Sequence, residues 1–224
     1  MILNKIRYSF LAGLKVAGYA LYPSKLNWIG QKPDNWNDVS LILVLNHTSL
    51  FEFVYGVTLP FDFLKALSSK LVIPVAEKTM KKPVSGFIFK YLAPHTISLT
   101  RKRDDSWQKF LDQIQQDNIC IFMPEGQMKR KNGLDKNGNT MKVKTGVYEL
   151  MQKYKGRKMA LVYSHGLHHI LAPGDKLPRM FKKVEADIEV LPVDEYLKSF
   201  TSKETAATDV AADLQRRRDK YCKD

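Results

Sequence analysis

The 224-residue chain lacks two features that mark specialised classes of protein. It has only two cysteines, Cys120 and Cys222, which are too few for a disulfide framework, so a reducing compartment is expected. The longest uncharged run in its N-terminal segment covers residues 16–24, far short of the roughly 20 apolar residues that span a bilayer. No small-residue cleavage site follows this run, so a signal peptide is not expected either.

Acidic residues are also scarce, and none precedes Asp34. The chain has 36 lysines and arginines against 23 acids, a net charge of +13, which implies an anionic partner. That partner is a nucleic acid, an acidic membrane or a phosphorylated substrate. Because the sequence has no recognisable nucleic-acid module and no aromatic stacking signature, no nucleic-acid partner is predicted.

The N-terminal segment predicts an amphipathic helix, since apolar residues recur at helical spacing at Leu3, Ile6, Phe10, Leu14, Ala17 and Leu21. Two interpretations stay open for this helix: it lies in a membrane interface, or it packs on the domain core. Pro23 ends the helix, and Trp28 and Trp36 then follow in a predicted loop at the depth of lipid headgroups. The chain is accordingly divided into a membrane-associating helix and loop (residues 1–30) and a single further domain (residues 31–224).

Aliphatic runs in the rest of the chain predict strands that alternate with helices. The predicted strands cover residues 41–45, 71–76, 97–99, 119–123, 159–163 and 184–191. This alternation predicts one α/β domain with a largely parallel sheet flanked by helices.

The first of these strands runs directly into Asn46 and His47, and Thr48 or Ser49 is predicted to cap a helix that follows at once. Glu52 lies five positions after His47 and can turn back onto the imidazole. Such an oriented pair is what a general base needs in order to take a proton from an alcohol near neutral pH. The alternative interpretation is a capping histidine and an unrelated surface glutamate.

Two further strand ends carry polar groups, Arg101 and Glu125-Gly126. Ligands of open α/β sheets collect at the carboxyl ends of strands, so a shared site is expected there. The histidines at positions 165, 168 and 169 lack cysteine or carboxylate partners at ligand spacing, so no metal site is predicted.

Several of these blocks together resemble the glycerolipid acyltransferase superfamily, in particular the bacterial lysophosphatidic acid acyltransferases. Residues 46–52 are similar to the Asn-His-x-Ser-x-x-Asp block, with Glu52 in place of the aspartate. Residues 122–126 are similar to the Phe-Pro-Glu-Gly block, and residues 97–101 to the block in which an arginine ends a short strand. The resemblance covers residues 40–165, but Gln127 and Met128 replace the threonine and arginine expected after the glycine.

The resemblance implies an O-acyltransferase that moves a fatty acyl group from an acyl thioester to the hydroxyl of a lysophospholipid, lysophosphatidic acid, at a membrane surface. It implies that His47 is the catalytic base and that Glu52 orients it. It further implies substrate-binding roles for a set of residues around them: Asn46, Ser49, Arg101, Glu125, Gly126, and Lys129 or Arg130 in place of the missing arginine.

The same resemblance implies no cofactor, with acyl-CoA or acyl carrier protein as the donor substrate. The expected location is the cytoplasmic face of a membrane with an anionic surface, where the protein is peripheral or monotopic. Two alternatives stay open: a non-catalytic basic lipid-binding protein on the same scaffold, and an acyltransferase for a different lysolipid acceptor.

Overall fold

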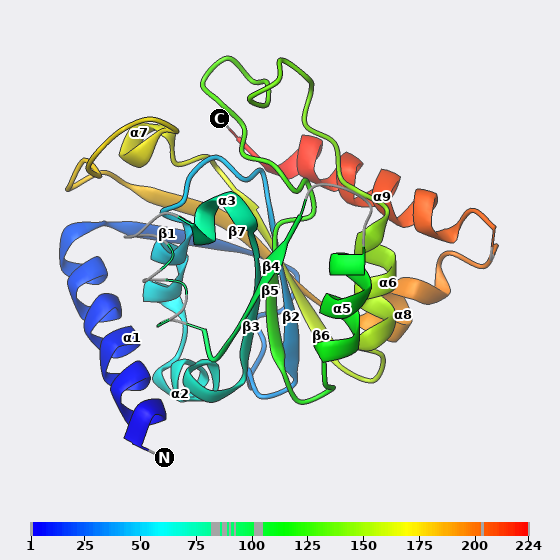
Figure 1. Cartoon of the computed structure of the whole chain (residues 1–224), viewed down its shortest axis with the longest axis horizontal. Coiled ribbons are helices and arrows are strands. Elements are labelled where there is room, and N and C mark those ends of the chain that lie inside the picture. Colours follow the sequence, from blue (N-terminus) through cyan, green and yellow to red (C-terminus); the bar gives the residue numbers. More distant parts are fainter. Residues whose placement is uncertain are drawn as a thin grey trace.

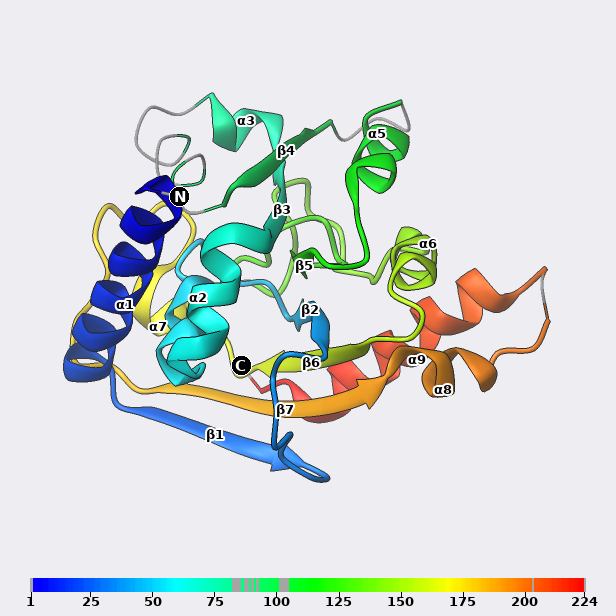
Figure 2. The ribbon, with the colours of Figure 1, turned by 90° about the horizontal axis from the view of Figure 1, so that it is seen from below.

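The computed structural model describes residues 2–81, 86, 89, 91, 93–100, 105–202 and 204–223. Within this part of the chain, one seven-stranded sheet in the order β1-β7-β6-β2-β5-β3-β4 lies between two layers of helices (Figures 1 and 2). Only the β6–β7 pairing is antiparallel; the other pairings are parallel. The predicted α/β fold with a largely parallel sheet is therefore confirmed.

The strands are β1 (Ser24–Ile29), β2 (Val39–Leu45), β3 (Leu71–Ala76), β4 (His95–Leu99), β5 (Ile119–Phe122), β6 (Lys158–Ser164) and β7 (Val184–Pro192). β2 stands at the centre of the sheet and is buried along its whole length. Its side chains alternate between the two faces of the sheet. Leu41, Leu43 and Leu45 enter one apolar cluster, whereas Ile42 and Val44 enter the other.

The first of these clusters is covered by α5 (Asp105–Gln113), α6 (Gly146–Lys153), α8 (Val193–Lys198) and α9 (Ala206–Tyr221). The second is covered by the 3-10 helix η1 (Glu52–Thr58), α2 (Phe61–Lys70) and the short α7 (His168–Leu171). α3 (Glu77–Met80) follows β3. The apolar spacing of residues 84–92 predicts a further helix, and this segment falls largely outside the described residues.

The N-terminal helix α1 (Ile2–Leu21) packs against η1 and α2, as Figure 1 shows at the left of the molecule. Lys15 donates hydrogen bonds from Nζ to the backbone oxygens of Val57 and Leu59. A Cβ atom at Gly18 would lie 2.4 Å from Cγ1 of Val57, so glycine is required for this close approach. The structure thus shows α1 packed on the domain, and a contact of this helix with a membrane stays a prediction.

Residues 24–29 form the edge strand β1, so the prediction of a loop at this position is wrong. Trp36 is buried against Phe63 and Trp28, with ring centroids 5.2 and 6.1 Å apart, and therefore does not lie at headgroup depth. β1 is a strand of six residues that pairs with β7 far along the chain, Ser24 with Val184, so the local pattern after Pro23 does not reveal this pairing. Among the described helices, none is long and apolar enough to cross a membrane.

Candidate active site

The candidate site lies where three neighbouring strands end. β2 is parallel to both β5 and β6, so the carboxyl ends of all three meet at one edge of the sheet. Asn46 and His47 follow β2, and Glu125 lies three residues beyond β5. β4 runs in the same direction, because β3 is parallel to both β4 and β5, and it ends at this edge too. Arg101, predicted at that fourth strand end, lies outside the described residues.

The structure brings His47 and Glu52 together. Nδ1 of His47 lies 2.5 Å from Oε2 of Glu52, and the exposed fractions of the two side chains are 15% and 3%. Because Nδ1 is occupied by this contact, Nε2 is the imidazole nitrogen left for a substrate proton. A neutral histidine with Nδ1–H bonded to a carboxylate presents its Nε2 lone pair as the base.

Burial of the His47 imidazole acts to lower its pKa, but the charge of Glu52 and its hydrogen bond act in the opposite direction. The negative charge of Glu125 adds to the effect of Glu52. The net result is a His47 pKa above its ordinary value of 6.5. Glu52 therefore makes the His47 imidazole more basic and stabilises its protonated form.

Glu52 also holds the backbone between His47 and the helix that follows. Its second oxygen, Oε1, accepts hydrogen bonds from the backbone N–H groups of Thr48 and Ser49, at 2.8 and 3.3 Å. The helix that follows is a 3-10 helix beginning at Glu52 itself, without a side-chain cap. The prediction that Thr48 or Ser49 caps the helix is therefore wrong, because the helix begins later, at Glu52, and Phe51 occupies the N-cap position.

Residues 46–52 form a corner between β2 and η1, called the His47 corner below. The hydroxyls of Thr48 and Ser49 form hydrogen bonds from this corner to the segment after β6. Thr48 Oγ1 accepts a hydrogen bond from the backbone N–H of Leu167 at 2.8 Å. Ser49 Oγ donates to the backbone oxygen of Leu171 at 2.6 Å and accepts from the N–H of Phe51. Both Thr48 and Ser49 are buried. In this structure Ser49, which was predicted to bind substrate, stabilises the backbone next to His47 through these hydrogen bonds.

Asn46 turns the chain from β2 towards His47 with a left-handed backbone, φ 67°. Non-glycine residues adopt this conformation only where surrounding contacts hold it. Here the N–H of Asn46 donates to Oε1 of Glu125 at 2.7 Å, and its side-chain Nδ2 donates to the backbone oxygen of Ser164 at 3.1 Å. The ends of β5 and β6 thus hold the residue that precedes the base.

Glu125 is 1% exposed, and its burial raises the pKa of its carboxyl group. The N–H of Asn46, the nearby His47 and Arg218 oppose this rise without cancelling it. Gly126 follows with φ 66°, a left-handed conformation that glycine adopts without strain. The Glu-Gly pair therefore forms a turn, closed by a hydrogen bond from the N–H of Gly126 to the oxygen of Met123. This turn contacts Asn46, the residue before His47, through the Glu125 carboxylate.

Lys129 and Arg130, the two predicted substitutes for the missing arginine, lie in different surroundings. The N–H of Lys129 donates to the backbone oxygen of His47 at 2.7 Å, and its Nζ donates to Oδ1 of Asn46 at 3.3 Å. Arg130 belongs to a turn closed by its own N–H and the oxygen of Leu134, and it is exposed. Of the two, Lys129 is the residue whose ammonium group lies beside the His47 corner.

The three histidines after β6 contact separate partners. Nε2 of His168 lies 2.8 Å from the oxygen of Lys129, and Nε2 of His169 lies 2.7 Å from the oxygen of Lys183. His165 faces Asp187, with 3.3 Å between its Nε2 and Oδ2. The described part of the chain contains no group of three or more histidine, cysteine or acidic side chains that could hold a metal ion.

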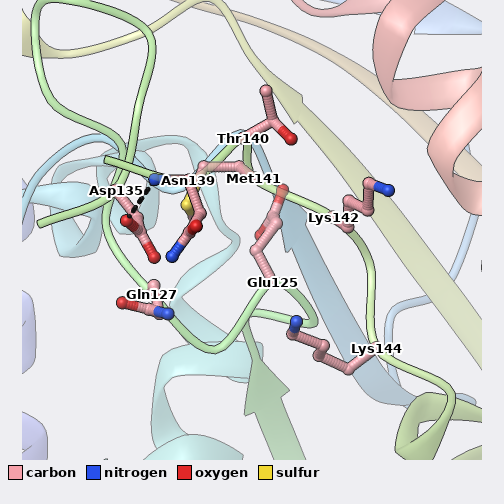
Figure 3. Close-up of a pocket in the computed structure, with 8 residues that line it drawn as sticks. All are labelled: Glu125, Gln127, Asp135, Asn139, Thr140, Met141, Lys142 and Lys144. Atoms are coloured by element: carbon pink, nitrogen blue, oxygen red, sulfur yellow. Dashed lines mark hydrogen bonds between the residues drawn. The ribbon is translucent and has the colours of Figure 1, made fainter. Parts of the chain in front are cut away.

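Two cavities lie beside this corner, and neither was predicted from the sequence. An apolar groove of about 440 Å³ runs between α1, η1 and residues 177–180, and Phe51 and Phe53 on either side of Glu52 line it. A polar cavity of about 310 Å³ lies on the side of Glu125 (Figure 3). The apolar positions of α1 in the sequence indicate a surface that could line the groove. The polar cavity leaves no such pattern, because it forms only when the loop of residues 127–144 folds back on Pro124.

Comparison with known protein families identifies the chain. A family model described as Acyltransferase matches residues 30–165, more than half of the sequence. The chain belongs to the acyltransferase family. The matched region contains the His47–Glu52 corner, the Glu125-Gly126 turn and strands β2 to β6, and the resemblance to the glycerolipid acyltransferase superfamily is thereby confirmed.

Among solved structures, this acyltransferase is similar to the 1-acyl-sn-glycerophosphate (LPA) acyltransferase PlsC from Thermotoga maritima. The TM-score is 0.55 at 17% sequence identity, and the match covers 96% of this chain and 81% of that chain. At this level of identity the likeness shows that the two proteins share a fold. A comparison with curated proteins found no match.

Proposed function

We propose that this acyltransferase moves a fatty acyl group from an acyl thioester to the hydroxyl of a lysophospholipid, with lysophosphatidic acid as an acceptor. The observation that carries the proposal is the buried contact between Nδ1 of His47 and Oε2 of Glu52. A histidine held in this way is the arrangement used to deprotonate an alcohol during acyl transfer.

In the proposed mechanism, Nε2 of His47 takes the proton from the acceptor hydroxyl as its oxygen attacks the carbonyl carbon of the thioester. Glu52 keeps the proton of the imidazole on Nδ1 and offsets the positive charge that His47 gains. The tetrahedral intermediate then collapses, the C–S bond breaks, and the imidazolium returns its proton to the thiolate. The donor is acyl-CoA or acyl carrier protein, no acyl-enzyme forms, and no cofactor takes part.

Lys129 is the residue of the described chain that we assign to the acceptor phosphate. Its ammonium group lies beside Asn46, one residue from the base, and its backbone is bonded to the oxygen of His47. A charge-assisted contact with phosphate at this position would hold the acceptor hydroxyl near Nε2. Arg101, at the end of β4, would supply a second cation in this proposal.

We assign the fatty acyl chain to the apolar groove. The groove is bounded by α1 and by η1, and it is lined by Phe51 and Phe53, the two chain neighbours of Glu52. Each methylene buried there contributes about 0.8 kcal/mol, so a long chain would bind far more tightly than a short one.

The exposed side of α1 and the loop beside it are the proposed membrane contact. Several large apolar side chains of α1 are exposed, including Phe10, Val16 and Tyr19, and Leu177 and Phe181 are exposed on the neighbouring loop. The N–H of Phe181 donates to the backbone oxygen of Leu21, so helix and loop share one surface. We propose peripheral or monotopic binding to the cytoplasmic face of a membrane, assisted by anionic lipid and the +13 charge.

The proposal is tested by incubating the purified full-length chain with acyl-CoA or acyl carrier protein loaded with one fatty acid, and with a panel of lysophospholipids in vesicles. Mass spectrometry should detect the diacyl product from lysophosphatidic acid with at least one of the two donors. Failure to form a diacyl product from any lysophospholipid with either donor would contradict the proposed function.

A further inference from the structure

The polar cavity beside Glu125 is built mainly by the loop that follows the Glu-Gly turn. Gln127, Asp135, Lys142 and Lys144 contribute to its lining, and Figure 3 shows the Glu125 carboxylate directed towards Thr140, away from the loop backbone that carries Gln127. Residues 127–144 are closed at their base by a hydrogen bond from the N–H of Lys144 to the oxygen of Pro124. The cavity therefore starts at the same turn that holds the His47 corner.

Two buried acceptors line this cavity without a donor among the described residues: Oε2 of Glu125 and Oε1 of Gln127. The other oxygen of Glu125, Oε1, accepts from the N–H of Asn46. Buried acceptors of this kind are unfavourable unless a ligand or solvent donor meets them. A ligand that donates hydrogen bonds to these two oxygens would therefore bind favourably in the cavity.

The charges around the cavity decide which kind of donor fits. Lys142 and Lys144 lie on exposed positions of the rim, and NH1 of Arg218 lies 3.9 Å from Oε1 of Glu125. Oδ1 of Asp135 already accepts hydrogen bonds from the N–H groups of Asn137 and Asn139. The three cationic side chains near the cavity outnumber its two carboxyl groups, so the local charge disfavours an added ammonium group and favours neutral hydroxyls beside an anion.

We infer that this cavity binds the part of the acceptor head group beyond the phosphate, and that this part is a neutral polyol. Its hydroxyls donate to Oε2 of Glu125 and Oε1 of Gln127, while Lys142 and Lys144 at the rim add positive charge that favours the phosphodiester held by Lys129. The inference rests on the proposed function and extends it: besides lysophosphatidic acid, the enzyme accepts lysophospholipids whose phosphate carries a hydroxylated head group.

The experiment compares four acceptors with one acyl chain: lysophosphatidic acid and the lysophospholipids with glycerol, ethanolamine and choline heads. For the wild type, kcat/KM for the glycerol head should exceed that for the choline head, which has no donors, by about 10-fold or more, since a polar site rejects analogues that leave it unpaired. Gln127→Leu should lower kcat/KM for the glycerol head relative to lysophosphatidic acid, again by about 10-fold.

Reversal of the rim charges tests the same inference without altering a buried side chain. The double variant Lys142→Glu/Lys144→Glu should raise kcat/KM for the ethanolamine head relative to the glycerol head. Lys131→Glu is the matched control, because Lys131 is exposed on the same loop but does not line the cavity, and it should leave that ratio unchanged.

The inference is overturned if the wild type prefers the ethanolamine head, or if it treats the glycerol and choline heads alike. It is equally overturned if Gln127→Leu leaves the ratio of kcat/KM for the glycerol head to that for lysophosphatidic acid unchanged and the double variant leaves the ethanolamine-to-glycerol ratio unchanged. These results would leave transfer to lysophosphatidic acid intact. Absence of transfer to all four acceptors would instead contradict the proposed function, and the inference with it.

Discussion

Oε2 of Glu52 lies 2.5 Å from Nδ1 of His47, while Oε1 of the same carboxylate accepts hydrogen bonds from the backbone N–H groups of Thr48 and Ser49. One side chain therefore orients the imidazole and also fixes the backbone that carries it. Glu52 is the first residue of η1, so the short segment from His47 to η1 is closed by the hydrogen bonds of one carboxylate.

Removing the charge of Glu52 should slow transfer and change its pH dependence. Glu52→Gln is expected to lower kcat by about 100-fold or more, because the imidazolium is no longer stabilised. The base must be neutral, so the acid limb of the wild-type kcat/KM profile should lie above pH 6.5, as the raised pKa of His47 requires. In Glu52→Gln, burial should dominate and move this limb to lower pH.

Glu52→Asp is the matched variant, since it keeps the charge and shortens the side chain by one methylene. We expect partial activity, with the acid limb near that of the wild type. A profile for Glu52→Gln that falls in rate but keeps the wild-type acid limb would show that Glu52 does not act through the pKa of His47.

Lys129 and Arg130 offer a matched pair for the acceptor phosphate. Lys129→Met should raise KM for lysophosphatidic acid by about 10-fold or more, through loss of a charged contact worth about 1.5–3 kcal/mol, and should change kcat little. Arg130→Met removes the same charge from the exposed turn and should have a much smaller effect. Equal effects of the two variants would argue for general attraction of anions rather than a contact at the site.

Gly56 provides a test of the acyl groove. It lines the groove, and a Cβ atom added there meets no other atom within 4 Å, so Gly56→Leu should fold and narrow the groove. Competition between donors of different chain length, read by mass spectrometry, should show a shift towards shorter chains. Gly13→Leu is the control, since Gly13 on α1 is equally open but does not line the groove. An unchanged chain preference in Gly56→Leu would place the acyl chain elsewhere.

The exposed side of α1 can be changed without disturbing its packed side. Val16 and Tyr19 are 62% and 77% exposed, so Val16→Ser/Tyr19→Ser should leave the melting temperature nearly unchanged and weaken sedimentation with anionic vesicles. Binding of the wild type should fall as salt rises and should be weak for neutral vesicles. Equal binding of wild type and double variant would remove α1 from the membrane contact.

The His47–Glu52 pair was predictable because its signals are local. A continuous aliphatic run predicts the buried strand β2. His47 and Glu52 are only five positions apart, so a single reversal of the chain can bring their side chains together. The neighbourhood of Glu125 was predictable only to the level of a shared sheet edge. That prediction followed from parallel strands, and the order β6-β2-β5 bears it out.

Contacts between distant segments were not predictable from these patterns. The hydroxyl of Thr48 receives its hydrogen bond from Leu167, which is 119 residues away, so the sequence pattern around Thr48 favoured a local cap instead. Likewise Lys142 and Lys144 reach the rim of the polar cavity only because the loop closes on Pro124. Long-range closure of this kind leaves no periodic signal in the sequence.

The central claim is that His47 is the base for acyl transfer, and the most direct measurement compares wild type with His47→Ala in transfer of a labelled acyl group to lysophosphatidic acid. Circular dichroism and thermal melting establish that the variant is folded. The account predicts loss of at least about 1,000-fold in the rate of transfer by a folded variant, with vesicle binding retained. Transfer by folded His47→Ala at the wild-type rate would contradict it.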